Sequence, residues 1–330
     1  MTSPLVHTIS ERITMNNTQA SQISRHFLSS AALLAAIAID PRHAFAQAEG
    51  IVPTMLKEAA TAPIEVHPLR RNITVLEGSG GNIAVLTGKD GKVLIDAGFK
   101  VSKARILDAL ASLDSASIKH LINTHWHFDH TDGNEWLHQA GAKITAHENT
   151  RKHLAVATRV EGWSFTFPAA PVGALPVEVF SENHTLHLND TKLFLDRYSP
   201  AHTDSDISIN FTEADVIHVG DTWWNGFYPF IDYSTGGSID GMIHATEKNL
   251  KLVTDTTIII PGHGPIARRA DLVEYRDMLV GIRANVATLK QQGRTLDETI
   301  AAKPTAAWDA KWGQFLMTPA VFTGLVYSGV

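Results

Sequence analysis

The stretch "NTHWHFDHTDG", Asn123 to Gly133, places three histidines and an aspartate within six consecutive positions: His125, His127, Asp129 and His130. Residues two apart in an extended segment point the same way, so His125 and His127 can bind one metal ion together. Asp129 and His130 follow in the next turn and can face a second ion beside the first. Six residues cannot surround two ions, so further ligands must come from elsewhere in the chain.

Three other strand-like runs break into a small-residue loop that carries a histidine or an aspartate. They are "RYSPAHTDSD" with His202, "VIHVGDTWW" with Asp221 and "TIIIPGHGP" with His263. Sites in open α/β sheets gather beyond the carboxyl ends of strands, so we expect these loops to converge on the first motif. Histidine and carboxylate ligands without sulfur favour Zn²⁺, with Mn²⁺ or Fe²⁺ as alternatives.

The order HxHxDH, downstream histidine, "GD" aspartate and "GHG" histidine resembles the metallo-β-lactamase-fold hydrolases. The resemblance runs from "DAGF" to "PGHGP" and implies an α/β fold, a four-layer αββα sandwich, with two zinc ions per chain. It assigns His125, His127 and His202 to the first ion, Asp129, His130 and His263 to the second, and Asp221 to a bridge between them. Asp96 in "LIDAG" matches an aspartate that supports the ligand loops rather than binding metal.

Several conspicuous residues are expected to be structural. Asp132 stands three residues before Glu135, a spacing typical of a helix start, so it is predicted to cap a helix and not to bind metal. Trp126 and Phe128 alternate with the ligands and are expected to pack behind the motif. Among the histidines outside the pattern, seven are expected at the surface or in structural hydrogen bonds: His120, His138, His147, His184, His187, His218 and His244.

The N-terminal residues 1–46 are interpreted as a secretory signal. Arg25 and His26 precede an apolar run over 27–39, and an AxA-like pattern ends at Ala46. The run is shorter than the roughly 20 residues that cross a bilayer. An ordinary N-terminal helix is the alternative. We expect cleavage after Ala46, a hydrolase domain over 47–330, a periplasmic location and no membrane contact after cleavage.

The composition limits the partners and the chemistry. Among 330 residues, 44% are apolar and 19% are charged, as in an ordinary globular protein. The formal charge of −6 provides no basic face, so no nucleic-acid partner is expected. The absence of cysteine removes thiolate ligands and a cysteine nucleophile. Any metal chemistry must therefore rest on histidines and carboxylates.

Strand and helix patterns alternate along the chain. Apolar runs predict strands at 73–76, 83–87 and 92–96, and the spacing over 101–113 predicts a helix. Further strands are expected on both sides of the motif and in the second half, with helices at 237–253 and 271–293 and a capping box formed by Thr295 and Glu298. The Pro-rich segment 155–182 is either a lid or a loop packed on the core. The aromatic loop 223–233 either walls the site or packs in the core.

The expected chemistry is hydrolysis. Two zinc ions about 3.5 to 4 Å apart can share a water and lower its pKa towards 7, and the hydroxide then attacks a carbonyl carbon. Asp129 would orient this hydroxide and accept its proton, without a covalent acyl-enzyme. Diiron oxygen-reducing relatives replace the second motif histidine by glutamate, and persulfide dioxygenases keep one iron. His127 and the full ligand set therefore favour a dinuclear hydrolase.

Two features of the sequence favour different substrate classes. Export favours a β-lactamase, but some β-lactamases of the family use a cysteine ligand, which this chain lacks, and Asp221 resembles glyoxalase II, lactonases and phosphodiesterases. Export disfavours glyoxalase II, whose thioester substrate is cytosolic, and the net negative charge disfavours phosphodiesterases. We expect a zinc hydrolase of a small-molecule cyclic amide or ester, with β-lactams first. A lactonase or a carboxylesterase or thioesterase of the same fold is the next hypothesis. A non-hydrolytic metal-binding or redox-relay accessory protein is the hypothesis from another class.

Overall fold

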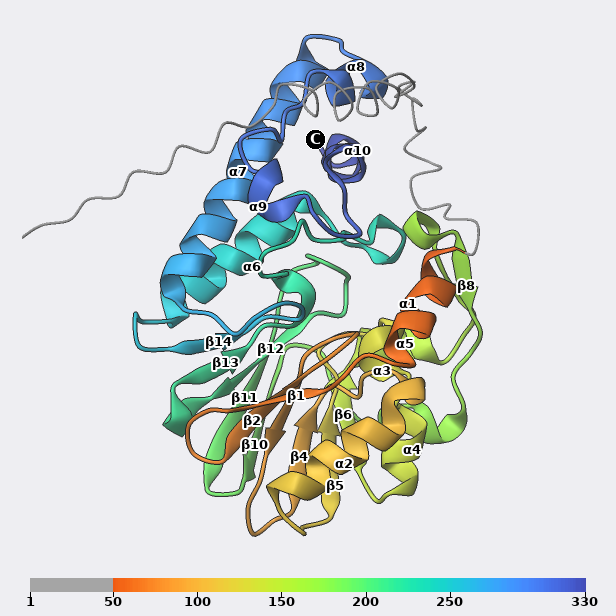
Figure 1. Ribbon diagram of the computed structural model, residues 1–330, viewed down its shortest axis with the longest axis vertical. Coiled ribbons are helices and arrows are strands. Elements are labelled where there is room, and N and C mark those ends of the chain that lie inside the picture. The colour runs from red at the N-terminus through yellow and green to blue at the C-terminus, as the bar shows by residue number, and fades with distance from the viewer. Residues whose placement is uncertain (1–49) are drawn as a thin grey trace, which may run out of the picture. The chain divides into compact units, whose positions relative to one another are not determined.

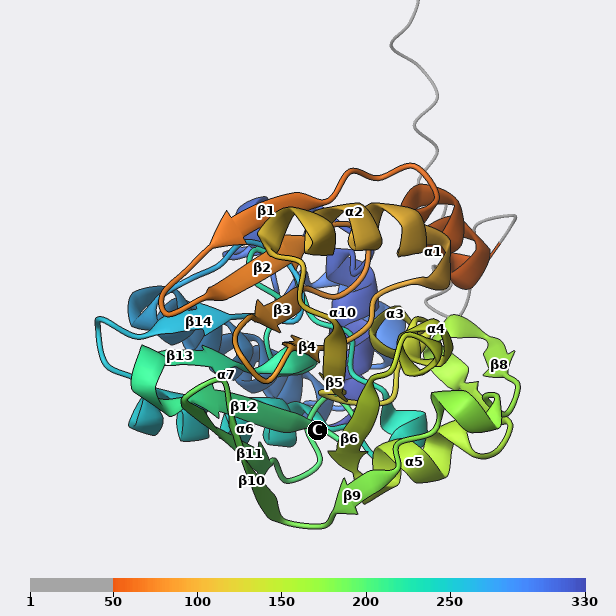
Figure 2. The same ribbon diagram turned by 90° about the horizontal axis from the view of Figure 1, so that it is seen from below.

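Two β-sheets face each other across an apolar core in the computed structural model, which describes residues 50–330 (Figure 1, Figure 2). All described residues belong to one compact unit. The predicted signal segment, 1–46, lies outside the described residues. No helix among residues 50–330 is long and apolar enough to cross a membrane.

The first sheet contains seven strands. They are β1 (Glu65–Pro68), β2 (Ile73–Glu77), β3 (Ile83–Leu86), β4 (Lys92–Ile95), β5 (Ile118–Ile122), β6 (Lys143–His147) and β9 (Glu178–Phe180), paired in that order. The strands β1 to β4 form an antiparallel meander. The strands β5, β6 and β9 then continue the sheet in parallel from β4. The carboxyl ends of these parallel strands therefore meet at one edge.

The second sheet contains five strands. They are β10 (Asn183–Leu188), β11 (Thr191–Arg197), β12 (Ile207–Phe211), β13 (Val216–His218) and β14 (Ile258–Ile260), again paired in chain order. The pairs are antiparallel except β13 with β14. Because β11 and β13 both run antiparallel to β12, the strands β11, β13 and β14 end at the same edge. A separate hairpin joins β7 (Thr158–Val160) to β8 (Phe165–Phe167).

Helices cover the outer face of each sheet. The α-helices are α1 (Ile51–Ala59), α2 (Lys103–Leu113), α3 (Phe128–Thr131), α4 (Asn134–Gln139), α5 (Glu148–Leu154), α6 (Ile239–Leu252), α7 (Arg269–Gln291), α8 (Leu296–Ala301), α9 (Asp309–Trp312) and α10 (Pro319–Ser328). In Figure 1, α6 and α7 lie beside the sheet that contains β13 and β14, whereas α2 and α4 lie beside β4 and β5.

The period-two alternation of buried strands explains the four layers. In β3, Ala84 and Leu86 join the core between the sheets, while Ile83 and Val85 join the core that contains residues of α2 and α4. In the second sheet, Ile217 of β13 and Ile259 of β14 pack in the cluster that contains residues of α6 and α7. Both sheets are thus apolar on two faces, and the predicted αββα sandwich is confirmed.

The predicted elements agree with the structure at most positions. The helix α7 ends two residues before Gly293, and Thr295 and Glu298 form both hydrogen bonds of the predicted capping box of α8. The prediction that Asp132 caps α4 was wrong. Gly133 is the N-cap of α4 and no side chain caps this helix. The Asp132 carboxylate instead accepts the N–H of Lys100 at 2.8 Å, a partner 32 positions away that local spacing could not reveal.

The segment 155–182 is a packed loop with its own short strands. It contains the β7–β8 hairpin and ends in β9, which extends the first sheet. Trp163 in this segment is buried, stacks on Phe230 at 5.1 Å and lies 4.8 Å from the ring of His127. The segment therefore also covers one side of the predicted ligand motif.

Candidate metal centre

All seven predicted ligands lie just beyond the ends of strands in both sheets. The motif residues His125, His127, Asp129 and His130 follow β5 and lie in or just before α3. The others follow later strands: His202 follows β11, Asp221 follows β13 and His263 follows β14. Six are buried, and the His263 side chain is 12% exposed. The strand directions described above bring these loops to one edge of the sandwich, as the sequence predicted.

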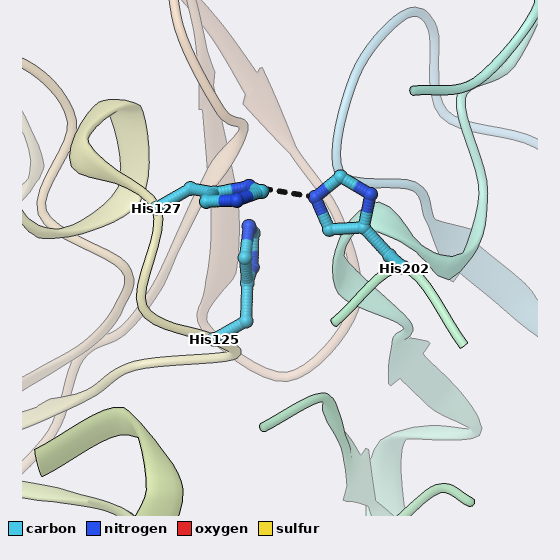
Figure 3. A group of neighbouring side chains, drawn as sticks. All are labelled: His125, His127 and His202. Carbon is cyan, nitrogen blue, oxygen red and sulfur yellow. Dashed lines mark hydrogen bonds between the residues drawn. The ribbon is translucent and has the colours of Figure 1, made fainter. Parts of the chain in front are cut away.

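The donor atoms gather in three overlapping groups, within each of which they lie no more than 4.8 Å apart. The groups are His125, His127 and His202; His125, His130 and Asp221; and Asp129, His130 and His263. Figure 3 shows the first group, whose three rings converge with a nitrogen of each directed inward. The first and third groups are the two predicted ligand sets, and the second places Asp221 between them.

The Asp221 carboxylate contacts both ligand sets. Its Oδ2 lies 3.4 Å from His202 Nε2 and 3.3 Å from His263 Nε2. Its Oδ1 lies 3.0 Å from His130 Nε2. One carboxylate is thus close to a member of the first set and to two members of the second, which is the arrangement expected of a bridging ligand.

The tautomers of two rings in the first group follow from their outer contacts. His127 Nε2 lies 3.0 Å from Asp232 Oδ2, and His202 Nδ1 lies 2.8 Å from the carbonyl oxygen of Phe230. Both oxygens can only accept, so each of these nitrogens carries the hydrogen. The inner nitrogens, His127 Nδ1 and His202 Nε2, then face each other as lone pairs at 2.8 Å. Two facing lone pairs repel unless a cation lies between them, so the residues fit a metal ion.

Asp96 orients the other side of the centre. Its Oδ2 accepts from His130 Nδ1 at 2.7 Å, and its two oxygens accept the backbone N–H and the hydroxyl of Thr124 at 2.8 and 2.7 Å. The Thr124 hydroxyl lies 3.0 Å from His125 Nδ1. Asp96 therefore holds His130 directly and His125 through Thr124, in agreement with the predicted supporting role. Its backbone has φ 65°, an uncommon conformation for a residue other than glycine.

Burial and charge set the protonation states within the centre. Burial lowers the pKa of His125 and of His127, so both imidazoles are neutral and free to bind a metal. Burial would also lower the pKa of His130, but the carboxylates of Asp221 and Asp129 raise it well above its usual value. Burial opposes ionisation of Asp221, yet the surrounding imidazoles, His130 foremost, hold its pKa well below the usual range. An anionic carboxylate among imidazoles suits a divalent cation.

Two glycines allow backbone to pack directly against the ligands. A Cβ at Gly81 would lie 2.2 Å from His130 Cε1, and a Cβ at Gly262 would lie 2.0 Å from Asp221 Oδ1. Asn82 joins the two segments, because its N–H donates to the Gly262 carbonyl at 2.8 Å. The β2–β3 turn and the loop after β14 thus close on the centre together.

We expect Gly262→Ala to impair the centre without removing any ligand. Gly262 has no positive φ, so the loss would come from the Cβ alone, which must displace the Asp221 carboxylate or the Gly220 backbone at 2.7 Å. A displacement of about 1 Å costs roughly 10²-fold in rate. Hydrolysis rate and bound metal should both fall. Gly226→Ala is the control, since its Cβ would have nothing within 4 Å and would bring only backbone strain. Equal effects of the two variants would contradict the expectation.

Some residues of the aromatic loop 223–233 pack in the core, and others contact the metal centre. Trp223 lies against Tyr275 of α7, and Tyr228 stacks on Phe322 of α10 at 4.6 Å. Trp224 and Phe230, in contrast, contact the ligand histidines, with Trp224 4.5 Å from His263 and Phe230 about equally distant from His127 and His202. Both predicted alternatives are therefore realised, each by different residues.

Asp232, Thr124 and Asn82 are among the neighbours of the centre that the sequence did not identify. Asp232 lies eleven residues after Asp221, in "DYST", where hydroxyl residues two and three positions later are a local sign of a capped turn. That sign predicts the turn and not the contact with His127. The seven histidines predicted to be structural lie outside all three donor groups. Two of them, His147 and His218, are buried and contact backbone carbonyl oxygens.

Comparison with known proteins identifies relatives. A family model described as the metallo-beta-lactamase superfamily matches residues 76–263, the span that contains all seven predicted ligands. A curated relative, the hydroxyacylglutathione hydrolase of Polaromonas sp., is 28% identical over 200 residues, which cover 56% of this chain and 68% of the relative.

Solved structures share the fold at low identity. A stereoselective inverting sec-alkylsulfatase from Pseudomonas sp. is 17% identical with a TM-score of 0.57 over 83% of this chain and 51% of its own. A metallo-beta-lactamase from Pontibacter korlensis is 16% identical with a TM-score of 0.52 over 66% of this chain and 99% of its own. This chain spans about half the length of the alkylsulfatase, and such likenesses show the fold alone.

Proposed function

The chain belongs to the metallo-beta-lactamase superfamily of hydrolases, and from this premise we propose that it is a dinuclear metal-dependent acyl hydrolase. The proposed substrates are esters, thioesters and lactones, with β-lactams as the second class. The observation that carries the proposal is the Asp221 carboxylate, which lies between a set of three histidines and a set of two histidines and an aspartate.

Each residue of the centre has a proposed task. His125, His127 and His202 would hold one ion, and Asp129, His130 and His263 the other, with Asp221 shared. Zinc at these positions would lower the pKa of a shared water towards 7 and polarise a carbonyl oxygen. Asp129 would orient the attacking water and accept its proton. No serine or cysteine nucleophile is required.

The choice of substrate rests on Asp221 and on the curated relative. The relative's name describes hydrolysis of an acyl group from glutathione, and the bridging carboxylate was the feature of the sequence that resembled glyoxalase II and lactonases. The expectation of β-lactams depends on export, which stays a prediction because residues 1–46 lie outside the described part of the chain. A β-lactam therefore takes second place, without being contradicted.

Metal analysis and a substrate screen on the purified protein test the proposal. We expect about two zinc equivalents per chain and hydrolysis of a lactone, an aryl ester or an acyl thioester. A chelator should abolish this hydrolysis, and added zinc should restore it. Cleavage of nitrocefin alone would transfer the proposal to β-lactams. Two bound ions with no turnover of any of these substrates would contradict hydrolysis and favour the metal-binding or redox-relay alternative.

A further inference from the structure

The turn from Asp232 to Gly237, called here the 232–237 turn, contacts the ligand motif from outside. Asp232 is 1% exposed, and its Oδ2 accepts from His127 Nε2 at 3.0 Å. The same oxygen accepts the hydroxyl of Thr235 at 2.6 Å, and Oδ1 accepts from the N–H of Ser234 at 3.0 Å and from its hydroxyl. The turn thus surrounds the carboxylate with donors and fixes the direction in which it faces His127.

The turn and its flanks also hold the residues on either side of that contact. The indole Nε1 of Trp126 donates to the Thr235 hydroxyl at 3.2 Å. The backbone N–H of Asp232 donates to the carbonyl oxygen of His202 at 2.9 Å, and His202 Nδ1 donates to the carbonyl oxygen of Phe230 at 2.8 Å. A single segment therefore orients two ligands, His127 and His202, that arrive from different sheets.

The consequence of these contacts concerns the hydrogen on His127. An imidazole can bind a metal only through the nitrogen without a hydrogen, and a neutral ring has two tautomers to choose from. A carboxylate on Nε2 retains the hydrogen there and leaves the Nδ1 lone pair directed at His202 and the centre. An outer carboxylate also makes the ring a stronger donor.

We propose that Asp232 is a positioning residue for the first ion, which fixes His127 in the tautomer that binds metal through Nδ1. The proposal rests on the ion binding assumed under the proposed function, but not on turnover of any substrate. A purely structural role is the competing explanation, because Asp232 also caps the short helix of residues 233–235. Asparagine keeps the cap and the shape of the side chain but removes the charge, so Asp232→Asn separates the two roles.

Stepwise zinc affinity, measured by competition with a chromophoric chelator, tests the proposal. We expect Asp232→Asn to weaken the first ion by about 10- to 100-fold and to leave the affinity for the second ion and the thermal midpoint unchanged. Asp215→Asn is the matched control. Asp215 likewise accepts two hydroxyls, those of Thr256 and Thr257 at 2.8 and 2.6 Å, but it pairs with Arg70 instead of an imidazole and belongs to none of the donor groups. Equal affinity in all three proteins, or an equal loss at both ion sites with a lower thermal midpoint, would overturn the proposal.

The tautomer itself can be observed without any variant. In the zinc-loaded protein, nitrogen-15 NMR of the imidazoles should show one hydrogen on His127 Nε2, slow to exchange, and none on Nδ1. A hydrogen on Nδ1 would overturn the proposal even if Asp232→Asn did not fold. If the unmodified protein bound zinc but hydrolysed no substrate of the screen, this would instead contradict the proposed function and leave this inference standing.

Discussion

Replacing Asp221 by alanine should release at least one ion and reduce hydrolysis to the level of the metal-free protein. Its carboxylate lies within 3.0 to 3.4 Å of nitrogens in both ligand sets, and the groups that lower its pKa are imidazoles, which cannot supply the lost negative charge. Loss of the negative charge also destabilises binding of both ions, because two cations would then repel each other without a bridging anion. Bound metal should fall from about two ions per chain to one or none.

The matched control for this variant is Asp255→Ala, since the Asp255 side chain is 93% exposed. Metal content by plasma emission spectrometry and the rate on the best substrate of the screen are the two measurements. The control should retain both. If Asp221→Ala kept two ions and its activity, the bridging assignment and the dinuclear proposal would both be wrong.

The ligand set could be predicted because each ligand is marked by the residues next to it in the sequence. Each ligand occurs in a short loop that follows an apolar run, and the direction of parallel strands is enough to bring such loops together. Asp96, which follows β4 directly, was instead identified from the resemblance to the metallo-β-lactamase-fold hydrolases. The four layers were predicted from the same resemblance, and strands that are apolar on both faces, such as β3 and β4, are their physical basis.

The residues that the sequence did not reveal depend on contacts between distant segments. Asp232 meets His127 across 105 positions, and Asn82 meets Pro261 across 179. No spacing rule extends over such separations. The Asp132 prediction failed for the same reason, because its carboxylate accepts the N–H of Lys100, which is distant in the sequence, and does not cap α4. The strands of the segment 155–182 have three residues each, too few for a period-two pattern to stand out among prolines.

Asp129→Asn should separate metal binding from proton transfer. The Asp129 Oδ2 lies 3.2 Å from His263 Nε2 and 3.5 Å from His130 Nε2, within the second ligand set. Burial alone would raise the pKa of Asp129, but His130 and His263 hold it below the usual value, so the carboxylate is ionised and able to accept a proton. An asparagine has the same shape and can still contact the ion through its oxygen, but it cannot accept the proton.

We therefore expect kcat to fall by about 10²- to 10⁴-fold at saturating zinc, with a smaller change in KM. The second ion should bind more weakly, because a neutral oxygen replaces an anionic one, and excess zinc should restore its occupancy without restoring the rate. Asp132→Asn is the control three residues along the motif: its carboxylate accepts the Lys100 N–H and belongs to none of the donor groups. A rate restored by zinc alone would make Asp129 a ligand only, and the proton acceptor would have to be sought elsewhere in the centre.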